Sequence, residues 1–180
     1  MIDERDVTYM NEVLRAIKTR RSIKKYKSEQ IKESELSLVL EAGTYAPTGR
    51  NLQSPVIVAV QDKETIKKMS KLNAAVMGTD IDPFYGAPTV IVVLADKTVN
   101  TYKEDASLVM ENLMLAAHSI GVGSCWIHRA REVFETEEGK KMLKEWGLSE
   151  NYEGVGNCIL GYADISPETK PRKDGYIIRV

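Results

Sequence analysis

The sequence has only two cysteines and two histidines among its 180 residues. Cys125 and Cys158 are too few for a disulfide framework, so we expect two buried thiols in a reducing cytoplasm. His118 and His128 stand in no spacing typical of metal ligands, and no metal site is expected. His118 falls within an apolar helical pattern, which favours a structural role. No nucleophile elbow frames Cys125 and His128, which argues against a catalytic thiol.

Long apolar runs and an excess of positive charge are also missing. No apolar segment approaches the ~18 residues that a membrane span needs, and residues 1–13 lack the apolar core of a signal peptide. The chain has 25 Lys and Arg against 26 Asp and Glu, a net charge of −1, which argues against a general nucleic-acid binder. We expect a cytoplasmic protein that binds neither nucleic acid nor membranes.

The common nucleotide-binding motifs are absent as well. The sequence has no GxxxxGK[ST] loop, and its GVG at 121–123 follows a predicted helix instead of a strand. A P-loop or a Rossmann dinucleotide site is therefore disfavoured. The length and the 43% apolar content indicate a globular chain, which we read as one domain.

Apolar periodicity predicts strands that alternate with helices. Helices are expected over 8–18, 34–44, 63–72, 102–120 and 131–146, and strands over 55–60, 88–96, 124–127 and part of 154–164. The segment 102–120 is apolar on several faces, which indicates a buried central helix. The order of elements leaves both an α/β and an α+β fold open.

The end of the chain is apolar. Tyr176, Ile177, Ile178 and Val180 lie beyond the last predicted core strand. A terminus without partners would not normally carry such residues, so we expect an arm that packs on a second copy of the chain.

Two basic stretches stand far apart in the sequence. Residues 19–27 read TRRSIKKYK, and in an extended segment Arg20, Ser22 and Lys24 share one face. Residues 169–174 read TKPRKD and hold Lys170 and Arg172. Each stretch alone is compatible with a solvated surface. Together they could converge on one phosphate, because guanidinium, hydroxyl and ammonium groups all donate to its oxygens.

A third stretch, YAPTGRNLQSP at 45–55, separates a predicted helix from a predicted strand. Its Thr48, Asn51 and Gln53 could hydrogen-bond a polar heterocycle, and an ordinary turn is the alternative. The chain thus offers groups for an anion and a heterocycle but no acid–base or nucleophile set. This combination favours a cofactor that carries the chemistry.

Five stretches, in this order, resemble the nitroreductase family: TRRSIKKYK, APTGRNLQSP, FYGAPTVIVV, ENLMLAAHSIGVGSCWI and GYADISPETKPRK. The resemblance covers about residues 11–175. It implies an α+β fold with a central, mainly antiparallel sheet surrounded by helices. It also implies one domain, 1–180, in an intertwined homodimer, with an arm over about 165–180 on the partner subunit.

The same resemblance implies FMN as cofactor and NAD(P)H as donor. Hydride would pass through flavin N5 to nitroaromatic, quinone or similar small-molecule acceptors in a ping-pong cycle. Matched by position, the cofactor-binding residues fall into four groups: Arg20, Arg21, Ser22 and Lys24 at the phosphate and pyrimidine edge; Lys170 and Arg172 at the phosphate; Pro47, Thr48 and Asn51 from the partner subunit; Cys125, Trp126 and Ile127 along the ring. Lys24 would stabilise the reduced flavin, and His128 has no clear role.

The chain departs from many relatives at two points. In many relatives a Trp, often preceded by Pro, comes after the Asn-x-Gln of the loop, whereas this chain has Gln53, Ser54 and Pro55 there. Lys24 stands where many relatives have Arg. The chain also lacks room for extra covering helices, so an open site is expected. Other flavin chemistry on the same scaffold (reductive dehalogenation, flavin reduction or fragmentation), a non-catalytic flavin-binding protein and a flavin-free anion-binding module remain alternatives. The sequence does not distinguish NADH from NADPH.

Overall fold

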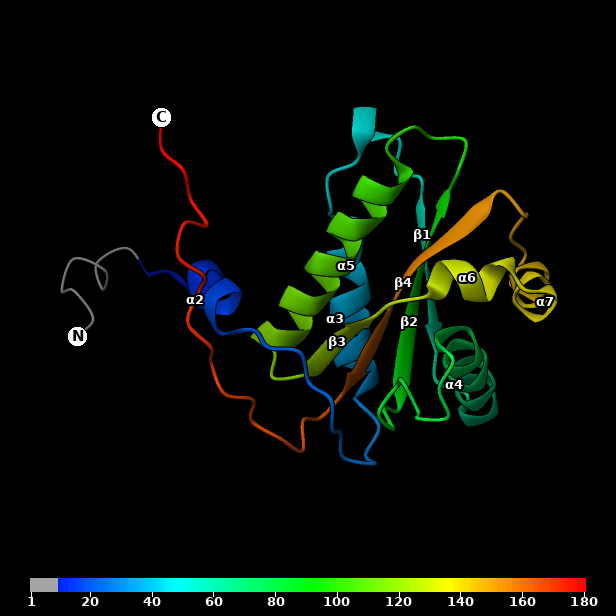
Figure 1. The fold of residues 1–180 in the computed structure, drawn as a ribbon, viewed down its shortest axis with the longest axis horizontal. Coiled ribbons are helices and arrows are strands. Elements are labelled where there is room, and N and C mark those ends of the chain that lie inside the picture. Colours follow the sequence, from blue (N-terminus) through cyan, green and yellow to red (C-terminus); the bar gives the residue numbers. More distant parts are fainter. Residues whose placement is uncertain (1–9) are drawn as a thin grey trace.

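The computed structural model describes residues 10–180, which fold around one four-stranded sheet (Figure 1). The strands are β1 (Pro55–Val60), β2 (Thr89–Asp96), β3 (Gly123–Ile127) and β4 (Tyr152–Gly161), in the order β1-β2-β4-β3. Each neighbouring pair of these strands is antiparallel. The α+β prediction is therefore confirmed, and the α/β alternative is wrong.

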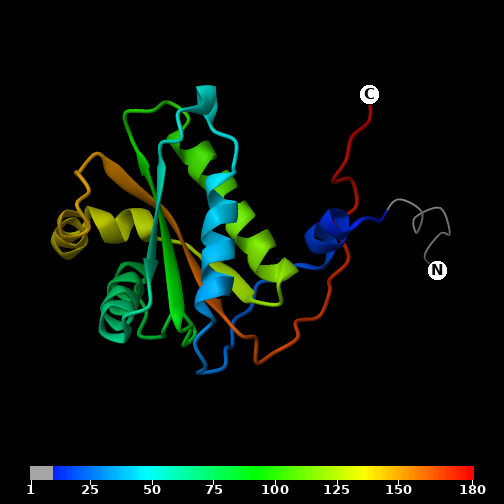
Figure 2. The ribbon, with the colours of Figure 1, turned by 180° about the vertical axis from the view of Figure 1, so that it is seen from behind.

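Helices cover both faces of the sheet (Figures 1 and 2). They are α2 (Glu12–Thr19), α3 (Glu33–Thr44), the short 3₁₀ helix η1 (Gly49–Asn51), α4 (Lys63–Met77), α5 (Tyr102–Ser119), α6 (Ala130–Glu135) and α7 (Glu137–Glu145). α3 and α5 pack on one face, and α4, α6 and α7 pack on the other.

Strand β2 contributes apolar side chains to both faces of the sheet. Its Val90 and Val92 belong to the apolar cluster under α4, α6 and α7, while Ile91 and Val93 belong to the cluster under α3 and α5. Successive side chains of a strand point to opposite faces. A continuous apolar run is therefore needed where both faces are covered, and PTVIVVLAD supplies it.

The two cysteines are separated by the sheet. Both are free and buried. Cys125 pairs across β3 and β4 with Ile159 in one apolar cluster, whereas Cys158 lies in the other cluster. Their side chains thus point to opposite faces, which agrees with the expected buried thiols.

Helix boundaries differ from the prediction where side chains cap the backbone. The predicted helix 131–146 is wrong as a single element, because Thr136 adopts an extended conformation (φ −71°, ψ 158°) between α6 and α7. Its hydroxyl accepts from Gly139 N at 3.0 Å and so caps α7. Helix α2 begins at Glu12 because the Asn11 side chain accepts from Leu14 N at 2.9 Å. Residues 8 and 9 of that prediction lie outside the described residues.

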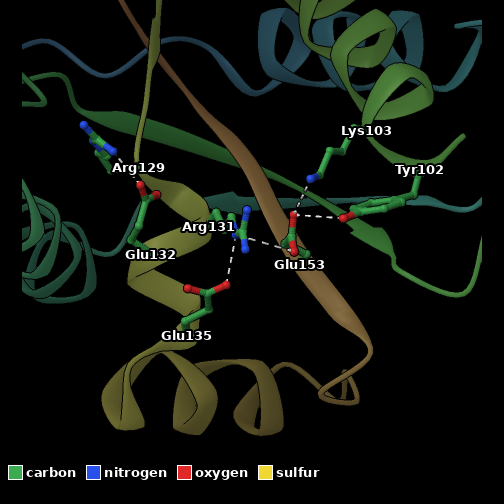
Figure 3. Close-up of polar contacts among 7 residues, drawn as sticks. All are labelled: Tyr102, Lys103, Arg129, Arg131, Glu132, Glu135 and Glu153. Carbon is green, nitrogen blue, oxygen red and sulfur yellow. Dashed lines mark hydrogen bonds and ion pairs between the residues drawn. The ribbon is translucent and has the colours of Figure 1, made fainter.

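A polar cluster at the start of β4 joins this strand to α5 and α6 (Figure 3). Glu153, 9% exposed, accepts from the Tyr102 hydroxyl at 3.2 Å, and its carboxylate oxygens lie 3.7 Å from Lys103 Nζ and from Arg131 Nε. Arg131 also contacts Glu135 at 2.9 Å. The cluster ties α5 and α6 to the sheet. Among the described residues, no group of three His, Cys, Asp or Glu side chains is arranged to hold a metal.

Helix α2 and the C-terminal segment leave apolar side chains exposed. α2 buries no residue, and its Leu14 and Ile17 are 40% and 49% exposed. Ile177 and Ile178 near the C-terminus are 77% and 84% exposed. Both segments lie together at one side of the molecule, away from the sheet (Figures 1 and 2). A single chain therefore does not cover this apolar surface. Within residues 10–180, no helix has the length and apolar character required to cross a membrane.

Candidate functional site

The first basic stretch runs as an extended segment beside β3. Ile23 N donates to Ser124 O at 2.9 Å, and Ser22 bridges Ser124 in the parallel sense. Tyr26 forms an antiparallel bridge to Ala163, just after β4. Backbone pairing therefore fixes residues 22–26 between the β3 edge and the chain that leaves β4.

A cavity of about 430 Å³, here called the basic cavity, lies between residues 19–23, 118–124 and 163–169. Arg21 and Thr169 both line it, and Arg21 Nη2 donates to the Thr169 hydroxyl at 2.9 Å. Arg21 Nη1 donates to two backbone carbonyls, of Lys18 and Arg20. The structure thus brings Arg21 against the segment that leads directly into Lys170. Lys170 and Arg172 themselves are exposed.

Two buried polar atoms in this region have no hydrogen-bond partner among the described residues. They are Arg20 Nη1 and Ser124 Oγ. Ser124 is 2% exposed and lines the basic cavity. An unpaired buried donor costs free energy, and more so when it is charged. A guanidinium and a hydroxyl are donors suited to anionic oxygens, so the residue types present fit a phosphate.

His118 borders the same cavity in the neutral form. Thr19 Oγ1 donates its proton to Arg15 O at 2.7 Å, so the 2.8 Å contact between Thr19 Oγ1 and His118 Nε2 has the imidazole as donor. Burial lowers the pKa of His118, and the positive charges of Arg20 and Arg21 lower it further. The hydrogen-bonded ring agrees with the structural role expected for this histidine.

The middle of β3 lies within reach of the first basic stretch. Burial raises the pKa of the Cys125 thiol, while the Ser22 hydroxyl and the charges of Lys24 and Arg20 act in the opposite direction. Cys125 donates to the Trp126 carbonyl at 3.6 Å. The thiol is therefore held protonated, as expected for a residue that is not a nucleophile.

The predicted ring-lining segment is largely buried, and the chain reaches the surface just after it. Trp126 is half-buried, Ile127 is buried, and His128 is exposed. Gly156 on β4 allows the indole to approach, because a Cβ there would lie 2.4 Å from Trp126 Nε1. Arg129, which follows, has a φ of 76°. A left-handed non-glycine residue is strained, and such residues cluster at functional sites.

The stretch 47–53 is also a fixed and strained loop. Gly49 N donates to the buried Asp105 carboxylate at 2.9 Å, and the Thr48 hydroxyl accepts from Gln53 N at 3.0 Å. Arg50, Asn51 and Gln53 all have φ between 51° and 55°. An ordinary turn does not require three non-glycine residues with positive φ that are held in place by side-chain hydrogen bonds.

This loop does not meet the basic cavity within one chain. Asp105 lies in the first turn of α5 and His118 in its last turn. An α-helix rises 1.5 Å per residue, so the two ends of this 18-residue helix are roughly 27 Å apart. Figure 2 places η1 and α2 at opposite ends of α5. The structure thus brings the two basic stretches and β3 together and leaves Pro47, Thr48 and Asn51 apart from them.

Three residues of the site were missed in the sequence. Tyr85, with φ of 53°, places its ring centroid 5.7 Å from Lys24 Nζ; its segment FYGAPTVIVV was part of the family resemblance, but Tyr85 itself was not selected. Ser124 and Thr169 were not selected either, although each adjoins a selected residue. Hydroxyls next to predicted cations are the signal that could have identified them.

Comparison with known proteins gives a consistent result. The sequence profile of the Nitroreductase family matches residues 17–83 and 81–162. A protein of Archaeoglobus fulgidus whose name includes the words NAD(P)H nitroreductase is 35% identical over 173 residues, which cover 93% of this chain and 91% of that protein. The NADPH-flavin oxidoreductase of Vibrio harveyi is 28% identical over 94% of this chain and 73% of its own length.

Solved structures resemble the fold closely. A nitroreductase with bound FMN from Bacteroides fragilis has a TM-score of 0.88 and 30% identity, covering 95% of this chain and 100% of that one. A nitroreductase with bound FMN from Desulfitobacterium hafniense has a TM-score of 0.86 and 26% identity, covering 95% and 99%.

Proposed function

The chain belongs to the nitroreductase family, and from this premise we propose that it transfers hydride from NAD(P)H to a small-molecule acceptor as an FMN-dependent oxidoreductase. Relatives named NADPH-flavin oxidoreductase and FMN reductase [NAD(P)H] support the cofactor and the donor. FMN-bound structural neighbours support the cofactor independently. The observation in this chain that carries the proposal is the basic cavity, lined by Arg21 and Ser124, next to Arg20, whose buried Nη1 has no hydrogen-bond partner among the described residues.

The phosphate of FMN fits the charges around this cavity. Arg20 and Ser22 would donate to its oxygens from the segment beside β3, and Arg21 holds the segment 163–169, which follows β4, in place through Thr169. Lys170 and Arg172 would close on the phosphate from the other side. Anchoring by charged donors supplies affinity and fixes the position of the ring.

When bound, FMN supplies the hydride transfer itself, so no general base is required of the protein. Lys24 would stabilise negative charge at the pyrimidine edge of the ring through its ammonium group. Cys125, Trp126 and Ile127 would lie along the ring, on a strand whose position is fixed by pairing with β4. The protein therefore contributes binding, orientation and electrostatic stabilisation.

We further propose a homodimer in which each site takes Pro47, Thr48 and Asn51 from the partner subunit. Within one chain these residues lie at the wrong end of α5. Their loop is nevertheless rigidly bonded, and the apolar side chains of α2 and of residues 176–180 are exposed. A second copy would cover that surface and complete the site.

The acceptor is proposed to be a nitroaromatic or quinone compound, reduced in a ping-pong cycle. The test begins with the visible spectrum of the purified protein and with FMN titration of the apoprotein. NADH and NADPH oxidation is then measured with a nitroaromatic, a quinone, free flavin and a halotyrosine. Parallel double-reciprocal lines support the cycle. A colourless protein that does not take up FMN refutes the proposed function.

A further inference from the structure

A larger cavity, of about 630 Å³, lies between α4 and residues 80–88 and is here called the α4 cavity. None of the predicted cofactor residues lines it. Its apolar wall includes Ile66, Ala74, Phe84 and Ala87. Ligand sites in proteins are typically apolar clefts of this size with a few well-placed polar groups.

One side of the α4 cavity carries three lysines, here called the rim lysines. Lys63, Lys67 and Lys71 are spaced four residues apart and so share one face of α4. All three are exposed, and none forms an ion pair within residues 10–180. Their neighbour Lys68, in contrast, contacts Glu138 at 2.9 Å. The rim lysines therefore remain available to an anion.

The opposite wall is fixed by one carboxylate. Asp82 accepts from the Ser70 hydroxyl at 2.6 Å, from Phe84 N at 2.9 Å and from Gly86 N at 2.8 Å. These bonds hold residues 82–86 against α4 and occupy both oxygens of Asp82. The carboxylate of Asp80, also in the wall, is exposed and forms no ion pair with a rim lysine.

An oriented amide also faces the cavity. Gln61 Nε2 donates to the Thr89 hydroxyl at 3.3 Å, and that hydroxyl donates to Gln30 Oε1 at 2.8 Å. The Gln61 carbonyl oxygen and its second N–H have no partner among the described residues. An amide that offers one acceptor and one donor beside an apolar slot matches the edge of a purine.

We propose that the α4 cavity binds the adenosine diphosphate half of the nicotinamide donor. The adenine enters the apolar slot with Gln61 at its edge, and the diphosphate lies on Lys67 and Lys71. Asp80 accepts from the ribose hydroxyls, as acidic residues do in other dinucleotide sites. This inference rests on the proposed function, because it assigns the distal part of the same substrate.

The position of the cavity supports this occupant. Phe84 and Gly86 line it, and Tyr85 between them lies over Lys24 of the cofactor site. The two sites therefore share one segment as a wall, and we expect a single dinucleotide to extend from one to the other. α4 lies on the other side of the sheet from α2 and the C-terminal segment (Figures 1 and 2). The proposed dimer leaves this cavity open.

The test uses the FMN-loaded protein and a Lys67→Gln/Lys71→Gln variant, with Lys144→Gln on α7 as the matched control. ADP binding is measured by equilibrium dialysis, and KM and kcat are measured with NADH. Removing two exposed cations from a phosphate site is expected to weaken ADP binding and to raise the NADH KM by about three- to tenfold each. The kcat is expected to stay unchanged, and the control is expected to match the parent.

Reduced nicotinamide mononucleotide separates this inference from the proposed function, because it lacks the adenosine half. The double variant is expected to affect NADH and not this shorter donor. Ala74→Trp, which fills the slot, is expected to have the same selective effect. Equal effects on both donors, ADP binding that is absent in the parent protein, or ADP binding that is unaltered in the variants would overturn the inference. Failure of the parent protein to bind FMN or to oxidise the shorter donor would instead refute the proposed function.

Discussion

Arg21 donates a hydrogen bond of 2.9 Å from Nη2 to the Thr169 hydroxyl, across 148 residues of sequence. This contact closes the basic cavity and places the two basic stretches of the chain beside each other. Because Arg21 already donates to three oxygens, it serves mainly to hold the segment 163–169 in place. Arg20 Nη1, in contrast, has no acceptor among the described residues.

Arg20→Gln is expected to weaken FMN binding by about tenfold or more, because a charged hydrogen bond contributes about 1.5–3 kcal/mol. Quenching of FMN fluorescence on titration into apoprotein measures the change. Lys144→Gln, on the exposed face of α7, is the control and should bind FMN like the parent. Identical titration curves for Arg20→Gln and the parent would contradict the phosphate assignment.

Deletion of residues 175–180 is expected to weaken dimerisation and flavin retention together. The deleted side chains include Ile177 and Ile178, which are exposed in a single chain and would be buried against a second copy. Light scattering after size-exclusion chromatography gives the mass, and the absorbance ratio of flavin to protein gives the FMN content. A truncated protein with unaltered mass and FMN content would remove the support for the arm.

Glu153→Ala is expected to lower the free energy of unfolding by about 1–3 kcal/mol, because it leaves the Tyr102 hydroxyl and Arg131 without their buried partner. Urea denaturation monitored by circular dichroism measures this. Glu135→Ala removes an exposed partner of the same Arg131 and is expected to change stability by less than about 0.5 kcal/mol. Equal losses in both variants would show that burial of Glu153 is not the cause.

His118 makes stability depend on pH. Burial and the nearby arginines lower its pKa in the folded protein below the ordinary 6.5, so the unfolded chain binds a proton more readily. The stability of the parent is therefore expected to fall as pH decreases below about 6.5. His118→Gln should reduce the loss of urea midpoint between pH 7.5 and 5.5. His128→Gln, at an exposed position, is the control, and the same loss in all three proteins would contradict the role of His118.

The sequence predicts most elements of the fold because their periodicity is strong. Helix α5 illustrates this, since Val109, Met110, Leu113 and Ala117 are buried at the spacing that predicted a central helix. The prediction of a single helix over 131–146 was wrong for a physical reason. Thr136 is an acceptable helix residue, and only its capping hydrogen bond with Gly139 N reveals the break between α6 and α7. The antiparallel pairing of the strands came from the family resemblance, because local patterns do not encode which strands pair.

The charges, the apolar patterns and the lack of catalytic acid–base groups follow directly from residue type and spacing. Three relationships appear only in the folded chain: Arg21 reaches Thr169, the loop at Asn51 lies at the N-terminal end of α5, away from the basic cavity, and the rim lysines face an apolar cavity. These relationships depend on how the chain folds around the sheet. Side chains far apart in sequence meet only when backbone pairing and core packing place them together.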